Sequence, residues 1–218
     1  MKKIGILGTG VVGTTIGTKL IQLGYEVKMG SREAGNAKAV AWTESNGVDA
    51  TQGSFSDAAV FGEVLFNCTK GEHALEAISL AGKQNLQNKI LIDISNPLDF
   101  SHGMPPTLIP ELVNTNSLGE AIQQAISDTY VVKTLNIVNC EVMVDALKCG
   151  GEATMFMAGN NDEAKQEVEQ ILKQFGWKDV IDLGVIAHAR SMEMMLPIWL
   201  SNYLALKNPY VAFKIVRS

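Results

Sequence analysis

The stretch that decides the fold is Gly8-Thr9-Gly10-Val11-Val12-Gly13, a GxGxxG sequence near the start of the chain. A short apolar run at residues 4–7 precedes it, which is typical of a strand buried on both faces. Apolar residues at helical spacing follow it as far as Gly24, and a second strand is predicted at residues 25–29. In this strand–turn–helix context the glycines allow a tight turn, close approach of a pyrophosphate and close packing of the helix. A dinucleotide site is therefore predicted at the start of the helix, the alternative being a glycine-rich turn that binds nothing.

The end of the second predicted strand indicates which dinucleotide is bound. NAD-binding units usually carry Asp or Glu about 20 residues after the central glycine, whereas this chain has Gly30-Ser31-Arg32 there. Ser31 carries no carboxylate, so nothing at that position would repel a 2′-phosphate. The Arg32 guanidinium can bind such a phosphate through two hydrogen bonds. Such a charge-assisted contact corresponds to roughly a ten- to hundredfold preference for NADP over NAD. NADP is therefore the predicted cofactor, unless Arg32 is simply a loop residue in solvent.

Strands and helices alternate along the rest of the chain. Runs rich in β-branched and aromatic residues predict strands at 64–68, 90–94, 130–135, 155–158 and 180–183. Apolar residues at helical spacing predict helices at 73–81, from 118 to about 125, at 164–175 and over about 187–207. This order predicts an α/β fold with a Rossmann-type, doubly wound parallel sheet. The Pro- and Gly-rich residues 96–110 predict a long loop after a strand.

Composition and charge exclude several classes of function. With 46% hydrophobic and 19% charged residues, the 218-residue chain is typical of a globular protein rather than a disordered or fibrous one. Its 18 Lys and Arg against 23 Asp and Glu give a net charge of −5, so no nucleic-acid partner is expected. No apolar stretch approaches the roughly 18 residues of a membrane span. Three scattered cysteines without a CxxC pair indicate a reducing compartment, and we expect a cytoplasmic protein.

No catalytic residue and no metal site is predicted. His73, His102 and His188 are single histidines without a Cys or a carboxylate at ligand spacing. Residues 203–207 spell the YxxxK of short-chain dehydrogenases, but they follow every predicted strand, and we interpret this match as chance. The Met-rich residues 192–199 could form an apolar wall for a planar molecule, a dimer face or plain core.

With the glycine motif at residues 8–13 and the stretches at residues 24–27 and 30–32, the chain resembles the NADP oxidoreductases that depend on coenzyme F420. That family includes F420–NADP reductases and the cytoplasmic reductase domains of membrane ferric-chelate reductases. The likeness covers essentially the whole chain and includes residues 8–13, 24–27, 30–32, 93–97, 131–136, 158–162 and 189–193. It implies an NADP-binding Rossmann domain over residues 1–150. It also implies a small C-terminal α/β-helical domain over residues 151–218 that closes a cleft.

The resemblance also implies roles for individual residues. It places Thr9 and the amides of Val11 and Val12 on the diphosphate, beside Gly8, Gly10 and Gly13, and it places Ser31 and Arg32 on the 2′-phosphate. Cys68, Thr69 and Lys70 would lie along the adenosine ribose and nicotinamide, and Asn96, Pro97 and Asn136 would line the nicotinamide pocket.

The predicted function is hydride transfer between NADPH and a planar acceptor, either coenzyme F420 or a flavin. Such a transfer needs stacking and exclusion of water more than acid–base residues, which is consistent with the absence of an evident catalytic dyad. Two alternatives stay open: a reductase of ferric chelates or small carbonyls, and a non-catalytic NADP-binding sensor. The expected partners are a small redox molecule and a second copy of the chain, held through the apolar C-terminal helices.

Overall fold

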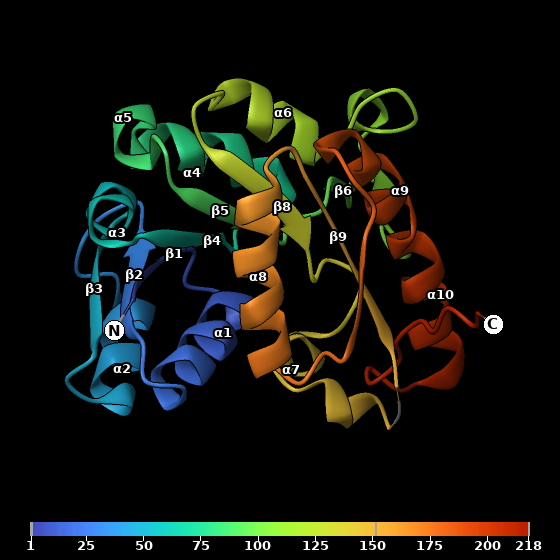
Figure 1. Cartoon of the computed structure of the whole chain (residues 1–218), viewed down its shortest axis with the longest axis horizontal. Coiled ribbons are helices and arrows are strands. Elements are labelled where there is room, and N and C mark those ends of the chain that lie inside the picture. The colour runs from blue at the N-terminus through green and yellow to red at the C-terminus, as the bar shows by residue number, and fades with distance from the viewer. Residues whose placement is uncertain (1, 151, 218) are drawn as a thin grey trace.

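The computed structural model describes residues 2–150 and 152–217, and its centre is an eight-stranded sheet (Figure 1). The strands lie in the order β10-β9-β8-β5-β4-β1-β2-β3. Their bounds are β1 (Lys3–Leu7), β2 (Glu26–Ser31), β3 (Ala50–Ser54), β4 (Val64–Asn67), β5 (Ile90–Asp93), β8 (Tyr130–Thr134), β9 (Thr154–Gly159) and β10 (Asp179–Asp182). The order reverses between β1 and β4, which is the switch point of a doubly wound sheet. The predicted Rossmann-type α/β fold is confirmed.

Helices cover both faces of this sheet (Figure 1). One face carries α1 (Val11–Gln22), α2 (Ala37–Asn46), α7 (Cys140–Met143) and α8 (Asp162–Gln174). The other carries α3 (Phe55–Phe61), α4 (Ala74–Ala81), α5 (Lys83–Leu86), α6 (Leu118–Ala125) and α9 (Ala189–Met194). Ile6 of β1 packs into the first core and Leu7 into the second, because successive strand side chains point to opposite faces. The remaining helices are α10 (Leu196–Leu206) and the 3₁₀ turns η1 (Gly71–His73), η2 (Pro110–Leu112), η3 (Ala146–Cys149) and η4 (Ile186–His188).

One pair of strands departs from the parallel arrangement. β9 runs antiparallel to β8, with Val132 opposite Gly159, and β10 is parallel to β9. The connection from β8 to β9 contains only the short α7 and η3. It therefore does not return the chain to the side of the sheet where the parallel strands begin, as a parallel β9 would require. Because β9 and β10 share the sheet with β8, the division into domains at residue 150 stays a prediction.

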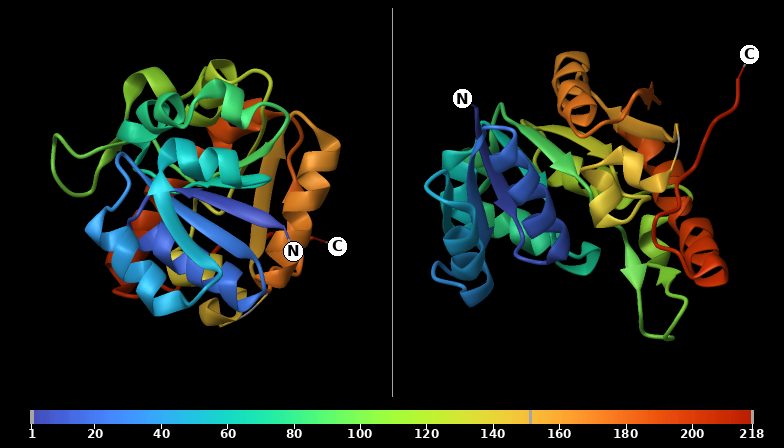
Figure 2. Two further views of the ribbon diagram at one scale, coloured as in Figure 1. Left: turned by 90° about the vertical axis from the view of Figure 1, so that its left-hand side faces the viewer. Right: turned by 90° about the horizontal axis from the view of Figure 1, so that it is seen from below.

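Several elements, three strands among them, were not indicated by the sequence pattern. The segment from α2 to α3 includes the edge strand β3, whose sequence Ala-Thr-Gln-Gly-Ser is small and polar. Within the expected long loop, β6 (Leu98–Asp99) and β7 (Thr107–Leu108) pair as a small antiparallel hairpin. Figure 2 shows this green hairpin projecting away from the body of the molecule.

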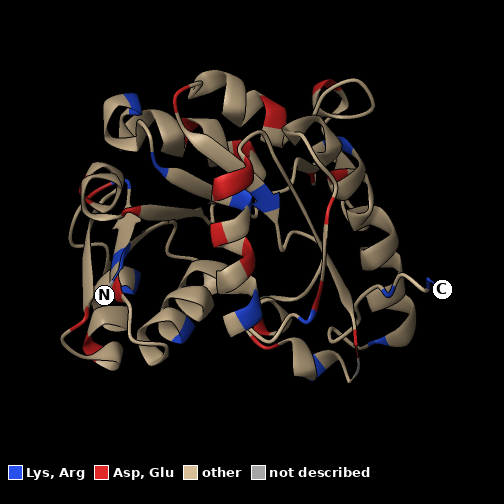
Figure 3. Cartoon of the chain, in the orientation of Figure 1, with Lys and Arg blue, Asp and Glu red and all other residues tan. Residues whose placement is uncertain are grey.

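Charges of both signs are spread over the elements of the fold (Figure 3). Among residues 2–150 and 152–217, no helix combines the length and apolar character that a membrane crossing requires.

Candidate functional site

The turn after β1 is shaped by the backbone of Gly8 and Gly13. Gly8 has a φ of +124°, a conformation that L side chains rarely adopt, and its amide donates to the carbonyl of Gly30 at 3.0 Å. A Cβ on Gly8 would lie 2.9 Å from the Cys68 carbonyl oxygen, and one on Gly13 would collide with the Gly8 carbonyl. Both glycines therefore allow strand, turn and helix to pack closely.

Gly10 differs from these two because it faces open space. It is the N-cap of α1 with a φ of −77°, and a Cβ built on it would meet no atom within 4 Å. The first turn of α1 contains no acidic residue, and the leading amides of a helix have no partner within the helix. This end of α1 therefore suits an anion, by its amides and by the positive end of the helix dipole.

Ser31 and Arg32 follow at the end of β2, next to the glycine turn. Ser31 is buried, and its hydroxyl donates to the carbonyl of Glu33 at 2.6 Å. The Arg32 guanidinium donates to both carboxylate oxygens of Glu76, from Nε at 3.2 Å and from Nη2 at 3.1 Å. These hydrogen bonds and the positive charge lower the pKa of Glu76. The guanidinium can bind an anion through two bonds, since it already does so with a carboxylate.

The end of β4 supplies the opposite wall of the site. The Thr69 hydroxyl donates to Asn67 Oδ1 at 2.7 Å, and the Lys70 side chain is exposed, with Nζ 3.9 Å from Glu72 Oε1. Burial, together with the charge of Asp93, raises the pKa of the Cys68 thiol far above its ordinary value. Cys68 is therefore a neutral wall residue rather than a nucleophile.

These segments enclose a cavity of about 480 Å³. Of the predicted site residues, Gly8, Thr9, Gly10, Ser31, Arg32, Cys68, Thr69 and Lys70 line it. Val11, Val12 and Gly13 follow directly in α1 but are not in the lining, and neither are Asn96, Pro97 and Asn136. The cavity has open space at Gly10, a helix N-terminus and a guanidinium, which is a donor set that fits a dinucleotide carrying an extra phosphate.

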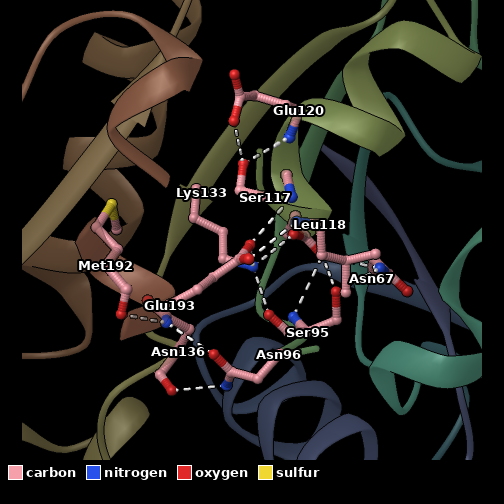
Figure 4. A network of polar contacts seen from close by, with 12 residues as sticks. Asn67, Ser95, Asn96, Ser117, Leu118, Glu120, Lys133, Asn136, Met192 and Glu193 are labelled. Atoms are coloured by element: carbon pink, nitrogen blue, oxygen red, sulfur yellow. Dashed lines mark hydrogen bonds and ion pairs between the residues drawn. The ribbon is translucent and has the colours of Figure 1, made fainter. Parts of the chain in front are cut away.

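Asn96 and Asn136 form a reciprocal pair beyond the ends of β5 and β8. Asn96 Nδ2 donates to the Asn136 carbonyl at 2.8 Å, and Asn136 Nδ2 donates to Asn96 Oδ1 at 2.9 Å. Asn136 Nδ2 also donates to the Met192 carbonyl of α9 at 3.0 Å. The pair thus connects two strand ends to the C-terminal part of the chain (Figure 4).

A buried charge network lies next to this pair, above it in Figure 4. Lys133 is 0% exposed, and its Nζ is 2.8 Å from Asp93 Oδ2 and 2.8 Å from Glu193 Oε1. Glu193 in turn accepts from the amides of Leu118 and Gly119 at 2.9 and 3.0 Å, at the start of α6. Burial raises the pKa of the Glu193 carboxyl, although Lys133 opposes the shift. Burial alone would lower the pKa of Lys133, but Asp93 and Glu193 raise it.

Sequence reasoning gave no role to Glu76 or to this network. Asp93, Lys133 and Glu193 are far apart in the chain and meet only in the fold. One signal was available, because a lysine within the β-branched run at residues 131–134 has to be paired if that strand is buried. Within the described ranges there is no group of three or more His, Cys, Asp or Glu residues that could hold a metal ion.

Known proteins similar to this chain include reductases that use NADP. Residues 3–97 match the family model described as NADP oxidoreductase, coenzyme F420-dependent. The crystal structure of a candidate F420-dependent NADP reductase from Arthrobacter sp. FB24 is 45% identical, covers 100% of both chains and has a TM-score of 0.94. The F420-dependent NADP reductase of Methanocaldococcus jannaschii is 27% identical over an alignment of 223 positions, and this alignment covers 98% of this chain and 97% of that protein.

A second group of similar proteins is larger than this chain. Metalloreductase STEAP3 of Rattus norvegicus is 30% identical over 205 residues, covering 90% of this chain. The chain spans only 38% of that metalloreductase's length.

Proposed function

Because this chain belongs to the family of coenzyme F420-dependent NADP oxidoreductases, we propose that it transfers a hydride between NADPH and a planar acceptor. Family membership makes the chain an NADP-dependent oxidoreductase. The acceptor is the proposed part, and we assign coenzyme F420 to it, with a flavin as the closest chemical substitute.

The observation that carries the cofactor assignment is the shared cavity of the glycine turn and Arg32. Amides at the start of α1 would hold the diphosphate, together with Thr9 and the amides of Val11 and Val12. Ser31 and Arg32 would hold the 2′-phosphate, which NAD lacks. Cys68, Thr69 and Lys70 would border the ribose.

Asn96, Pro97 and Asn136 are proposed to border the nicotinamide side of the site. When bound, the nicotinamide supplies the hydride chemistry. The chain's own residues then position the reactants, because the Asn96–Asn136 pair is held by main-chain and side-chain hydrogen bonds. Hydride transfer itself calls for no side chain that donates or accepts a proton, and solvent can supply the proton that the reduced acceptor takes up.

The acceptor assignment is supported by how completely each relative matches. The reductase of Methanocaldococcus jannaschii, named for F420 dependence, aligns over 97% of its own length. The metalloreductase STEAP3 aligns over 38% of its length. That second likeness favours a ferric chelate as the alternative acceptor.

The test is NADPH consumption by the purified protein with a panel of acceptors: coenzyme F420, FMN, FAD, a ferric chelate and small carbonyls, repeated with NADH. Saturable NADPH oxidation with F420 at a higher kcat/KM than with any other acceptor is expected. Saturation with a ferric chelate or carbonyl and indifference to F420 and flavins would support the alternative. Tight NADPH binding with no turnover would instead indicate a sensor.

Arg32→Ala tests the 2′-phosphate assignment directly. The Kd for NADPH should rise about tenfold or more, since a charge-assisted hydrogen-bond pair is lost, while the Kd for NADH should change less than about twofold. Titration calorimetry with both cofactors measures the two effects. Arg32→Lys, which keeps the charge but not the two-bond geometry, should fall between. Equal losses for NADPH and NADH would refute the assignment.

We further propose that the protein acts in the cytoplasm as a homodimer. The location is supported by Cys68, Cys140 and Cys149, which are all free thiols. The dimer is supported by exposed apolar side chains on α10, including Ile198 and Leu204. In light scattering, the wild type should have twice the mass of the chain, and Leu204→Glu should shift it to a monomer that still binds NADP⁺. A monomeric wild type would exclude the dimer.

A further inference from the structure

The Arg32 guanidinium is already engaged by an acidic side chain of the protein itself. Arg32 follows β2, and Glu76 is the third residue of α4, 44 positions further along the chain. The two side chains meet through two of the three guanidinium nitrogens, Nε and Nη2, and both carboxylate oxygens. Both residues line the same cavity, so this ion pair stands within the proposed cofactor site.

The geometry of this pair is the geometry that a phosphate would need. A carboxylate and a phosphate each present two oxygens to the parallel N–H groups of an arginine. The Glu76 carboxylate therefore occupies the Nε–Nη2 edge of the guanidinium, where a 2′-phosphate can form the same two bonds. Arg32 and Glu76 are 58% and 50% exposed, and ion pairs at such exposure are weak and screened by salt. An incoming phosphate can replace the carboxylate.

The neighbouring charges distinguish Glu76 from the other acidic residues of the segment. Glu72 lies 3.9 Å from Lys70 Nζ and 3.6 Å from His73 Nε2, and it makes no ion pair with Arg32. Glu76 lies 3.8 Å from His73 Nδ1 as well as on Arg32. Glu76 is thus the carboxylate placed to compete for the guanidinium, whereas Glu72 contributes only its charge.

We propose that Glu76 is an internal competitor of the 2′-phosphate, which holds Arg32 until NADP replaces it and so limits the preference of the site for NADP over NAD. This proposal rests on the proposed function, in that Arg32 must be the group that binds the 2′-phosphate. Two consequences follow. After exchange, the displaced carboxylate remains close to the phosphate and repels it. With NAD, the Arg32–Glu76 pair stays intact, and the carboxylate can accept from a ribose hydroxyl.

The experiment is titration calorimetry of Glu76→Gln with NADP⁺, NAD⁺ and adenosine 2′,5′-bisphosphate, a probe that carries the 2′-phosphate without the nicotinamide. The Kd for NADP⁺ and for the bisphosphate should fall about two- to fivefold, which is the range of an exposed ion pair. The Kd for NAD⁺ should stay the same or rise. The gain should shrink at 0.5 M salt, where the Debye length is below about 8 Å.

Two further variants separate competition from long-range charge. Glu72→Gln removes one negative charge from the same segment without freeing Arg32, so it should tighten NADP⁺ binding less than Glu76→Gln does. In the Arg32→Ala background, Glu76→Gln should give a smaller gain for NADP⁺, because it then relieves only the repulsion between the carboxylate and the phosphate and frees no guanidinium. An equal effect of Glu72→Gln, or an undiminished gain without Arg32, would overturn the competitor role.

These measurements also separate failure of this inference from failure of the proposed function. If Arg32→Ala leaves the ratio of NADP⁺ to NAD⁺ affinity unchanged, the 2′-phosphate assignment itself is wrong. If Arg32→Ala lowers that ratio and Glu76→Gln does not raise it, the assignment stands and the competitor role is refuted.

Discussion

Gly10 and Gly13 lie three residues apart, yet a methyl group would have opposite consequences at the two positions. At Gly10 it meets open space in the cavity, and the φ of −77° suits alanine. Gly10→Ala should therefore leave the unfolding midpoint unchanged. It should weaken NADP⁺ binding about tenfold, because the second glycine of this motif admits the pyrophosphate to the backbone. Thermal unfolding and calorimetry measure the two effects.

Gly13→Ala is the matched comparison. Its methyl group would collide with the Gly8 carbonyl, and overpacking against rigid backbone costs about 1–3 kcal/mol of unfolding free energy. Stability and cofactor binding should fall together in this variant. A Gly10→Ala protein that binds NADP⁺ like the wild type would show that the diphosphate lies elsewhere.

Cys68 illustrates how a wall residue is kept unreactive. Burial raises the pKa of its thiol, so little thiolate exists at pH 8. With limiting iodoacetamide under native conditions, we expect Cys140 and Cys149 to be modified before Cys68, as followed by peptide mass spectrometry. Unfolding in urea should remove the difference. Preferential modification of Cys68 in the folded protein would contradict the neutral-wall interpretation.

At the level of elements, the Lys133 network joins β5, β8, α6 and α9. Lys133→Met would leave the buried carboxylates of Asp93 and Glu193 without their cation, and breaking a buried ion pair in this way costs about 3–5 kcal/mol. Urea unfolding should show this loss. Lys173→Met is the control, because that lysine is half exposed on α8 beside Glu169, where a pair contributes at most about 1 kcal/mol. Similar losses of unfolding free energy in both variants would mean that the buried network stabilises the fold no more than an exposed ion pair does.

The elements also show what can be predicted from sequence and what cannot. The glycine turn and the Ser31–Arg32 pair are each a short contiguous stretch of sequence. Local spacing was therefore sufficient to predict them and to indicate NADP. β3 was missed because an edge strand does not have to be apolar, and its sequence is polar and small. Glu76 and the Lys133 network were missed because their partners come together only through the strand order.

For the whole molecule, the pattern of carboxyl pKa values predicts how stability changes with acid. Hydrogen bonds lower the pKa of Asp57, Glu76, Asp99, Glu141 and Asp179, the last to about 2. A carboxyl whose folded pKa is lowered stabilises the folded state above its unfolded pKa of about 4, and this contribution is lost as the pH falls through the folded value. Glu193, with a raised pKa, acts in the opposite sense.

We therefore expect the urea midpoint to fall between pH 6 and pH 3. Asp179→Asn should lower the midpoint at pH 6, because Thr154, Lys214 and Arg217 lose their shared carboxylate. The difference from the wild type should narrow as the pH approaches 2. A wild-type urea midpoint that is constant from pH 6 to pH 3 would contradict the stabilising role of these carboxylates. A difference between Asp179→Asn and the wild type that widens in acid would contradict the lowered pKa of Asp179.

The reversed direction of β9 also determines where a reporter group can be attached. β9 is antiparallel to β8 and β10 is parallel to β9, so the carboxyl end of β10 lies on the same side of the sheet as the amino end of β8. The exposed Val185 follows β10 on this side. A dye or affinity handle carried at position 185 would sit on the rim opposite the nucleotide, leaving the coenzyme entrance unobstructed.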